Sequence, residues 1–308
     1  MTEQKIKVIA VVGPTASGKS SLALALARHL NGEIVSCDSM QIYREMDIGT
    51  AKATNEQRQS VPHHLIDVAD PMQDWSLSEF TAAAHRAISE IVSRGKLPIL
   101  CGGTGLYLDH ILFDTVLSEA PGDAAYRESL SEYSNEALHA MLKEIDLTSA
   151  NANHPNNRRR VIRALEIYHT TGKTKTEWDS QSRQKTPRYD ALIFGLNAEN
   201  REFLYRRIEM RVDEMMEMGL AEEVERLAPR LGKTASQAIG YKEIILGLQG
   251  HCSMEQAVME LKTATRRYAK RQLTWFRANP AIKWFDIEQN SKEMILEQCL
   301  EMMRTFTA

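Results

Sequence analysis

The sequence has no closely spaced pair of cysteines and no long apolar run. Its four cysteines, Cys37, Cys101, Cys252 and Cys299, are scattered, which argues against a zinc ribbon, a zinc finger or a disulfide framework. The apolar run Val8–Val12 is far too short to span a bilayer, and the residues before it lack the apolar stretch and cleavage site of a signal peptide. We therefore expect a soluble cytoplasmic protein with no membrane partner.

The chain also has little net charge, yet its positive charge is concentrated locally. The formal net charge of −3 gives no overall attraction to nucleic acid. However, Lys262–Arg277 carries six positive side chains and no negative one, and Arg158–Arg160 with Arg163 forms a second basic cluster. Such clusters suit a phosphate backbone, because affinity depends on the number of phosphates neutralised locally. Basic runs are more often solvated helix faces, so charge alone leaves both interpretations open.

A phosphate-binding loop is the clearest motif. GPTASGKS lies between the strand-like run KVIAVVG and a helical pattern at Ser20–Leu30. Its glycines let backbone N–H groups face an anion, and the following helix adds its positive end. A lysine here reaches the outer phosphate and the next hydroxyl can bind Mg²⁺, which predicts an oligophosphate held with a metal ion. The expected contacts are Gly13, Pro14, Thr15, Ala16, Ser17, Gly18, Lys19 and Ser20.

Strands and helices alternate after this loop. Further strands are expected at Glu33–Cys37 and Leu97–Cys101, with a helix at Leu77–Arg94 between them. This order predicts an α/β fold, a P-loop NTPase-like parallel sheet flanked by helices, with ligands at the carboxyl ends of the strands. The strand pattern disappears between Phe113 and Asp190.

We therefore expect an all-helical insertion domain at residues 114–190, between the two parts of a catalytic core, 1–113 and 191–308. A strand at Ala191–Leu196 would return the chain to the core, and Arg201–Phe276 would form a helical C-terminal region.

Candidate chemical groups follow the second and third expected strands. Asp38 can ligate Mg²⁺ through water, act as a general base or cap the next helix, and its position does not decide among these roles. Thr104, in CGGTGLY, offers an uncharged hydroxyl, although glycine pairs at strand ends are commonly turns. The adjacent His63 and His64 lack a metal-binding spacing, and we expect a structural role for them.

Two arginines one helical turn apart, Arg207 and Arg211, complete the set. An arginine from a later segment can stabilise phosphate charge. A surface ion pair is the more common role for such a residue.

Together these stretches resemble a known family, the bacterial tRNA dimethylallyltransferases, also called tRNA isopentenyltransferases. The phosphate loop is shared with many enzymes, whereas DSMQIY…DIGTAK together with AKRQLTWFR is specific. No C-terminal zinc finger of the eukaryotic members is present, so the resemblance is to the bacterial type. The matching stretches, in family order and spacing, are GPTASGKS, DSMQIYREMDIGTAK, PHHLIDVADP, GGTGLYL, HPNNRRRVIRALEIYHTTGK, IGYKE and TRRYAKRQLTWFR.

The resemblance implies transfer of a dimethylallyl group from dimethylallyl diphosphate to N6 of the adenosine 3′ of the anticodon, in tRNAs that read codons beginning with U. It implies that Asp38 is the general base and that Thr104 lies at the diphosphate bridging region. Lys19, Ser20 with Mg²⁺, and Arg211 would bind the diphosphate, with Arg207 in reserve for Arg211.

The resemblance also implies which segments hold tRNA. The insertion domain would contact the anticodon stem-loop, and we expect the protein to act as a monomer. The expected tRNA contacts are Asp38, Ser39, Met40, Gln41, Arg127, Arg159, Arg160, Arg163, Gln237, Ala238, Ile239, Gly240, Tyr241, Lys242, Arg266, Arg267, Lys270 and Arg271. Tyr268 and Trp275 can stack on bases or belong to the core.

Two other functions use some of the same residues. An adenylate isopentenyltransferase or another P-loop small-molecule kinase-like enzyme would use the loop and Asp38 on a free nucleotide, but it would not need the basic C-terminal helix. An RNA-binding protein with a nucleotide switch would need neither Asp38 nor Thr104 as chemical groups.

Overall fold

The computed structural model describes residues 5–114, 122–182 and 186–307. The chain divides into two compact units, Met1–Leu112 with Arg188–Ala308, and Phe113–Pro187. The insertion expected from sequence, 114–190, ends three residues beyond the second unit, which ends at Pro187. Those residues lie in the first unit because the Arg188 N–H donates to the Leu112 carbonyl and the Asp190 N–H donates to the Ile6 carbonyl.

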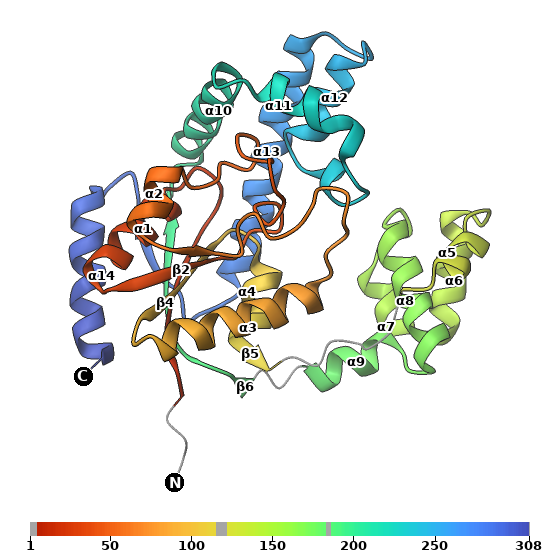
Figure 1. The fold of residues 1–308 in the computed structure, drawn as a ribbon. Helices are drawn as coiled ribbons and strands as arrows, with labels where there is room; N and C mark the ends of the chain where they lie inside the picture. The colour runs from red at the N-terminus through yellow and green to blue at the C-terminus, as the bar shows by residue number, and fades with distance from the viewer. Residues whose placement is uncertain (1–4, 115–121, 183–185, 308) are drawn as a thin grey trace. The chain divides into compact units, whose positions relative to one another are not determined.

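A parallel sheet forms the centre of the first unit. Figure 1 shows β2 and β4 of this sheet with helices beside them. Within the described residues the sheet has six strands in the order β3-β2-β4-β1-β7-β8, all paired in parallel. The strands are β1 (Lys7–Val12), β2 (Gly32–Ser36), β3 (His63–His64), β4 (Leu97–Gly102), β7 (Asp190–Asn197) and β8 (Lys283–Asp286). The predicted α/β class is confirmed, and the short edge strands β3 and β8 extend the sheet beyond the strands expected from sequence.

Both faces of the central strands are covered. Ile9 pairs in register with Ile99 of β4 and Leu192 of β7, and these residues pack with helices α1 (Lys19–His29) and α14 (Lys292–Thr307). Helix α3 (Leu77–Ser93) begins with a capping box at Ser76 and buries its apolar stripe beside β2 and β4. Strand β1 is therefore almost wholly buried, as parallel strands require.

The C-terminal part of this unit is helical. Helices α10 and α13 pack on each other, and an apolar cluster joins them to the phosphate loop through Ala16, Leu204, Ile208 and Ala269. This cluster places one face of α13 beside the phosphate loop, although the two segments are far apart in sequence. The remaining elements are α2 (Asn55–Ser60), α4 (Gly105–Leu112), α10 (Arg201–Glu217), α11 (Leu220–Leu227), η1 (Ala228–Arg230), η2 (Ala235–Gln237), α12 (Tyr241–Leu248) and α13 (Met254–Arg277).

The second unit has its own small core of helices, centred on Leu138, Leu142, Val161 and Leu165. Two short strands, β5 (Phe113–Asp114) and β6 (Thr186–Pro187), pair antiparallel at its ends. Its helices are α5 (Ala124–Ser129), α6 (Asn135–Ile145), α7 (Leu147–Ala152), α8 (Arg158–Thr171) and α9 (Lys175–Ser182).

Across the described parts of both units, no helix combines the length and apolarity needed to cross a bilayer.

Candidate active site

The phosphate loop follows β1 directly and has the backbone that its sequence predicts. Gly13 and Gly18 have φ of 142° and 93°, and Ala16 also has a positive φ, 62°. Only glycine fits at the first position, because a Cβ there would lie 2.3 Å from the Leu196 carbonyl oxygen. The Lys19 Nζ donates to the Pro14 carbonyl at 2.6 Å, which holds the ammonium over the loop.

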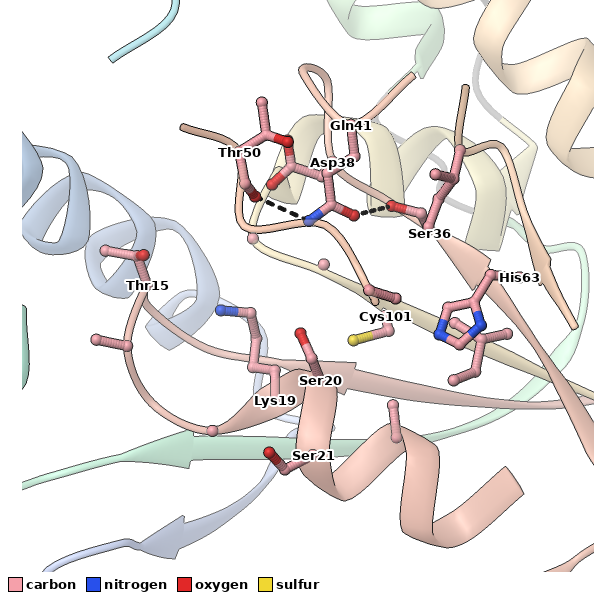
Figure 2. A pocket seen from close by; sticks show the side chains of 18 of the residues that line it. Thr15, Lys19, Ser20, Ser21, Ser36, Asp38, Gln41, Thr50, His63 and Cys101 are labelled. Atoms are coloured by element: carbon pink, nitrogen blue, oxygen red, sulfur yellow. Dashed lines mark hydrogen bonds between the residues drawn. The ribbon is translucent and has the colours of Figure 1, made fainter. Parts of the chain in front are cut away.

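A cavity of about 160 Å³ opens beside the loop. Lys19 and Ser20 extend into it from the start of α1, and Asp38 lies across from them at the end of β2 (Figure 2). Arg211 of α10 and Tyr268 of α13 complete the polar lining. The sequence motif and residues from three later segments thus meet in one space.

The charges of this cavity favour an anion. Burial is the main reason that the pKa of Lys19 is lowered to about 8; Arg211 also lowers it, whereas Cys101 and Asp38 act in the opposite direction. Burial also lowers the pKa of Arg211, while Asp38 opposes this change. Burial raises the pKa of the Cys101 thiol to about 11, so this thiol stays protonated. Two partly desolvated cations facing one carboxylate leave a site that a diphosphate would neutralise.

Asp38 is held by its own turn. The Met40 N–H donates to Asp38 Oδ1 at 2.9 Å, and the next helix begins only at Asn55. The helix-cap alternative for Asp38 is therefore wrong. Thr104 lies beside it, because the Thr104 N–H donates to the Cys37 carbonyl at 3.3 Å and the Thr104 Oγ1 accepts from the Ser39 N–H at 3.4 Å.

Two residues of α13 that sequence reasoning did not place in the site connect its walls. Gln272 is 5% exposed; its Oε1 accepts from the Thr15 N–H at 2.8 Å, and its Nε2 donates to the Gly103 carbonyl at 3.0 Å. One turn earlier, Tyr268 lines the cavity, and burial raises its pKa to about 12. Their four-residue spacing in TRRYAKRQLTWFR was the available signal.

A second cavity, of about 310 Å³, adjoins the first. Thr15, Asp38, Thr50, Arg211 and Tyr268 line both cavities, so Asp38 and Arg211 stand where the two spaces meet. The second cavity gathers many of the residues expected to hold the acceptor: Ser39, Met40, Gln237, Ala238, Ile239, Gly240 and Arg271.

The two candidate arginines have different positions. The Arg207 Nε donates to the carbonyl of Ala16 at 2.8 Å and so supports the loop from behind. Arg211 lines both cavities. Neither guanidinium forms an ion pair with an acidic side chain within the described residues. Of the two, Arg211 is therefore the arginine that borders the first and second cavities.

Comparison with known proteins decides the family. Residues 41–279 match a family model described as IPP transferase. The tRNA dimethylallyltransferase of Geobacillus kaustophilus is 51% identical over 287 residues, covering 91% of this chain and 90% of that protein. The tRNA dimethylallyltransferase of Anoxybacillus flavithermus is 47% identical over 92% of each chain. The chain belongs to the IPP transferase family.

Solved structures agree with this assignment. A tRNA delta(2)-isopentenylpyrophosphate transferase from Staphylococcus epidermidis superposes with a TM-score of 0.73 at 40% identity and covers 98% of this chain and 99% of that one. A eukaryotic dimethylallyltransferase described as acting on tRNA has a TM-score of 0.84 at 30% identity, covering 98% of this chain and 79% of that one. The predicted family and fold are confirmed.

In this IPP transferase, several expected tRNA contacts have other positions in the first unit. Tyr241 is fully buried and its hydroxyl donates to Glu223, so its side chain faces the core. Arg266 forms an ion pair with Glu209 of α10 at 2.5 Å. The other basic residues among the expected contacts of this unit are exposed: Arg267, Lys270 and Arg271 on α13 and Lys242 on α12. Gln41 lines the first cavity and fixes the neighbouring loop by donating to the Thr50 carbonyl at 3.1 Å.

In the second unit of the transferase, two of the four expected arginines are committed to a buried carboxylate. Glu166 is fully buried, and Arg127 Nε and Arg163 Nη1 lie 2.7 and 2.6 Å from its oxygens. Arg159 and Arg160 are exposed on α8. Loss of Arg127 would leave part of a buried charge uncompensated, so its substitution would affect stability as well as any RNA contact.

The adjacent histidines differ: the contacts of His64 fit the structural role expected for both, whereas His63 borders the first cavity. His64 Nε2 lies 2.7 Å from Glu33 Oε2, and Arg94 pairs with the same carboxylate. His63 hydrogen-bonds to the Val61 carbonyl while its ring lines the first cavity. Burial lowers the pKa of His63, so this imidazole is neutral at pH 7.

Proposed function

We propose that this protein transfers the dimethylallyl group of dimethylallyl diphosphate to N6 of the adenosine 3′-adjacent to the anticodon, in tRNAs that read codons beginning with U. The observation that carries the proposal is the junction of two cavities at Asp38 and Arg211. One cavity has the chemistry to bind a diphosphate and the other has room for a base, so the transferred carbon would lie between them.

The donor would bind through the phosphate loop. Its backbone N–H groups and Lys19 suit the diphosphate oxygens, and a bound anion would compensate the desolvated ammonium. The Ser20 hydroxyl, exposed at the start of α1, is the residue suited to hold Mg²⁺ together with phosphate oxygens. When bound, Mg²⁺ would supply further neutralisation of the leaving diphosphate.

The chemistry needs one proton acceptor and one stabilised leaving group. The N6 lone pair forms a bond to the allylic C1 as the C1–O bond to diphosphate breaks, and Asp38 takes the N6 proton. An exocyclic amine conjugated to a purine is a poor nucleophile, so a carboxylate in contact with it lowers the barrier. Arg211 and Lys19 balance the charge that develops on diphosphate, and Thr104 can donate its hydroxyl hydrogen to the bridging oxygen.

The acceptor base would enter the second cavity from the stem-loop. A base that undergoes chemistry must leave its stack, and this cavity is lined by Met40, Ile239, Gly240 and Arg271. The exposed Arg267 and Lys270 continue the basic surface on α13. A free-nucleotide acceptor would not need that surface, so the adenylate alternative is not favoured.

Product analysis tests this function. Purified protein with Mg²⁺ and labelled dimethylallyl diphosphate should label undermodified tRNA on the N6 of the adenosine beside the anticodon, and should leave AMP and ADP unlabelled. Labelled AMP would support the free-nucleotide alternative. ATP turnover without label on any RNA would support a small-molecule kinase or a nucleotide switch.

A further inference from the structure

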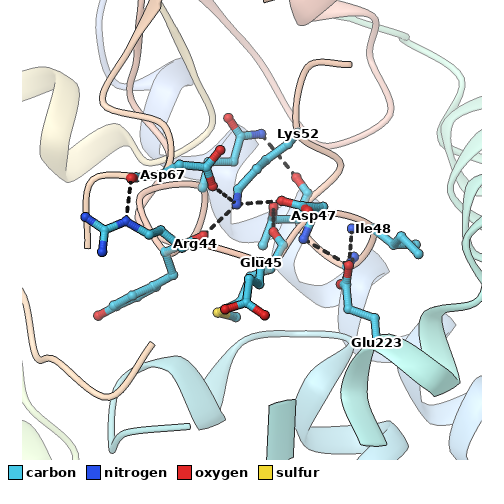
Figure 3. A network of polar contacts seen from close by, with 12 residues as sticks. Arg44, Glu45, Asp47, Ile48, Lys52, Asp67 and Glu223 are labelled. Carbon is cyan, nitrogen blue, oxygen red and sulfur yellow. Dashed lines mark hydrogen bonds and ion pairs between the residues drawn. The ribbon is translucent and has the colours of Figure 1, made fainter. Parts of the chain in front are cut away.

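A buried carboxylate outside the proposed catalytic groups contacts two segments that line the second cavity. Glu223 of α11 is 5% exposed. Its Oε2 accepts from the N–H groups of Asp47 and Ile48 at 3.0 and 2.8 Å, and its Oε1 accepts from the Gly49 N–H at 3.0 Å. Figure 3 shows Glu223 reaching the chain at Asp47 and Ile48. Three consecutive backbone donors thus converge on one side chain.

The same carboxylate also holds the opposite segment. The Tyr241 hydroxyl donates to Glu223 Oε1 at 2.5 Å. Burial and the hydrogen bond to Glu223 raise the pKa of Tyr241, so the phenol remains a donor at every physiological pH. Its ring lies against Gly49, where an added Cβ would come within 2.5 Å of Tyr241 Cε2. Glu223 therefore connects two segments far apart in sequence.

Both segments form walls of the second cavity. Gly49 and Thr50 of the first segment line it, and so do Gln237 to Gly240, immediately before Tyr241. The two segments meet at Gly240 and Gly49: Gly240 has a φ of 100°, and a Cβ added to it would lie 3.9 Å from Gly49 Cα. The relative position of these two segments therefore shapes the cavity that they line.

The segment 47–52 has a second support that does not involve Glu223. Lys52 has a side chain that is 2% exposed and donates to the Tyr43 carbonyl and to Asp47 and Asp67 at 2.5 to 2.8 Å (Figure 3). Loss of the Glu223 carboxylate would leave these contacts in place. The expected result is a loosened cavity wall and an intact loop.

We propose that Glu223 is a positioning residue for the acceptor base: it fixes the relative position of two segments that line the second cavity and thereby the approach of N6 to the transferred carbon. The proposal rests on the function proposed above. Glu223 and the residues that it contacts, 47–49 and 241, do not line the donor cavity. Acceptor alignment should therefore depend on Glu223, and donor binding should not.

The variant Glu223→Gln tests this role with little change in volume. In the variant, the amide NH₂ replaces one carboxylate oxygen and would face N–H or O–H donors. Those donors would lose the acceptor that they have in the unsubstituted protein. At saturating tRNA and donor, kcat should fall roughly 10- to 100-fold, because small errors in alignment have effects of this size. The dissociation constant for pyrophosphate with Mg²⁺ should change less than about two-fold. The dissociation constant for tRNA should change less than about three-fold, since phosphate contacts supply most of that affinity.

Three further variants keep the test decisive. Glu225→Gln changes an exposed glutamate on the same helix and should leave all constants unchanged. Gly49→Ala would push the walls apart with Glu223 intact and should reproduce the kcat loss. Tyr241→Phe keeps the packed ring and removes one of four hydrogen bonds, so kcat should fall less than about three-fold.

Active-site titration with pyrophosphate distinguishes positioning from misfolding. A fall in kcat with a full complement of pyrophosphate sites supports the positioning role. A fall in proportion to lost pyrophosphate sites, an unchanged kcat in Glu223→Gln, or full activity in Gly49→Ala would overturn it. Absence of tRNA labelling by the unsubstituted protein would instead overturn the proposed function.

Discussion

Burial of the Lys19 ammonium lowers the stability of the free protein. The variant Lys19→Met measures this cost as a change in the free energy of unfolding. The ammonium is charged in the unfolded chain and partly desolvated in the fold, which lowers its pKa from 10.5 to about 8. That difference corresponds to roughly 3 kcal/mol at about 1.4 kcal/mol per pKa unit. The lost hydrogen bond to Pro14 offsets about 1 kcal/mol of the gain on substitution. The free Lys19→Met protein should therefore be more stable at pH 7 by roughly 2 kcal/mol.

The sign of this effect sets its pH dependence. Because the folded-state pKa is the lower one, the cost of protonated Lys19 is fully present below pH 8. The cost disappears as the pH rises from about 8 to 10.5, where the unfolded chain also loses the proton. The stability advantage of Lys19→Met should shrink across this window. The exposed Lys283 offers a control, since Lys283→Met should show no such dependence.

Pyrophosphate should reverse the order of stability. At about 100 times its dissociation constant, a ligand stabilises the fold by about 2.7 kcal/mol, and the variant should lose most of this gain. Differential scanning calorimetry at pH 7, with and without pyrophosphate and Mg²⁺, measures both effects. A free variant that melts at or below the unsubstituted protein, or a variant that keeps the full pyrophosphate shift, would refute the reasoning.

Three other substitutions separate the remaining roles. Asp38→Ala should lower the single-turnover rate by roughly 10²- to 10⁴-fold with little change in pyrophosphate affinity; an equal loss of pyrophosphate affinity, measured by calorimetric titration, would indicate a metal-binding role. Changing Arg267, Lys270 and Arg271 together to Ala should weaken tRNA binding and reduce its dependence on salt; an unchanged salt slope in filter-binding assays would make this an ordinary solvated face. Gln272→Ala should destabilise the protein by roughly 2–4 kcal/mol, because two buried backbone groups lose their partner, and should weaken pyrophosphate binding; a melting temperature unchanged in calorimetry would contradict this.

The local parts of the site could be predicted from sequence. A buried β-branched strand, a glycine loop and a helix start are specified by neighbouring residues, and the loop has the expected positive φ angles. The positions of Asp38 and Thr104 were predictable for a second reason: each follows a strand, and parallel strands end at one edge of the sheet. The edge strand β8 gave no such signal, since its residues Lys283 and Trp284 are exposed and pairing with β7 defines it.

The residues that α10 and α13 contribute to the site were harder to predict from sequence. Arg207 and Arg211 share a helix face in sequence, and only packing of α10 against the loop assigns one to the Ala16 carbonyl and the other to the cavities. In α13 the basic run concealed the inward face that carries Tyr268 and Gln272. A heptad-like pattern indicates that a helix has a buried face, but not which distant backbone groups meet it.

The sequence alone was enough to predict an anion site at the phosphate loop, because the expected donors are the main chain and side chains of one short segment. The family resemblance identified the transferred group and the acceptor. Tertiary structure alone decided that Glu223, indistinguishable in LAEEVERL from its exposed neighbours Glu222 and Glu225, holds two walls of one cavity. Its role depends on donors from residues 47–49 and 241, which only folding brings to a single carboxylate.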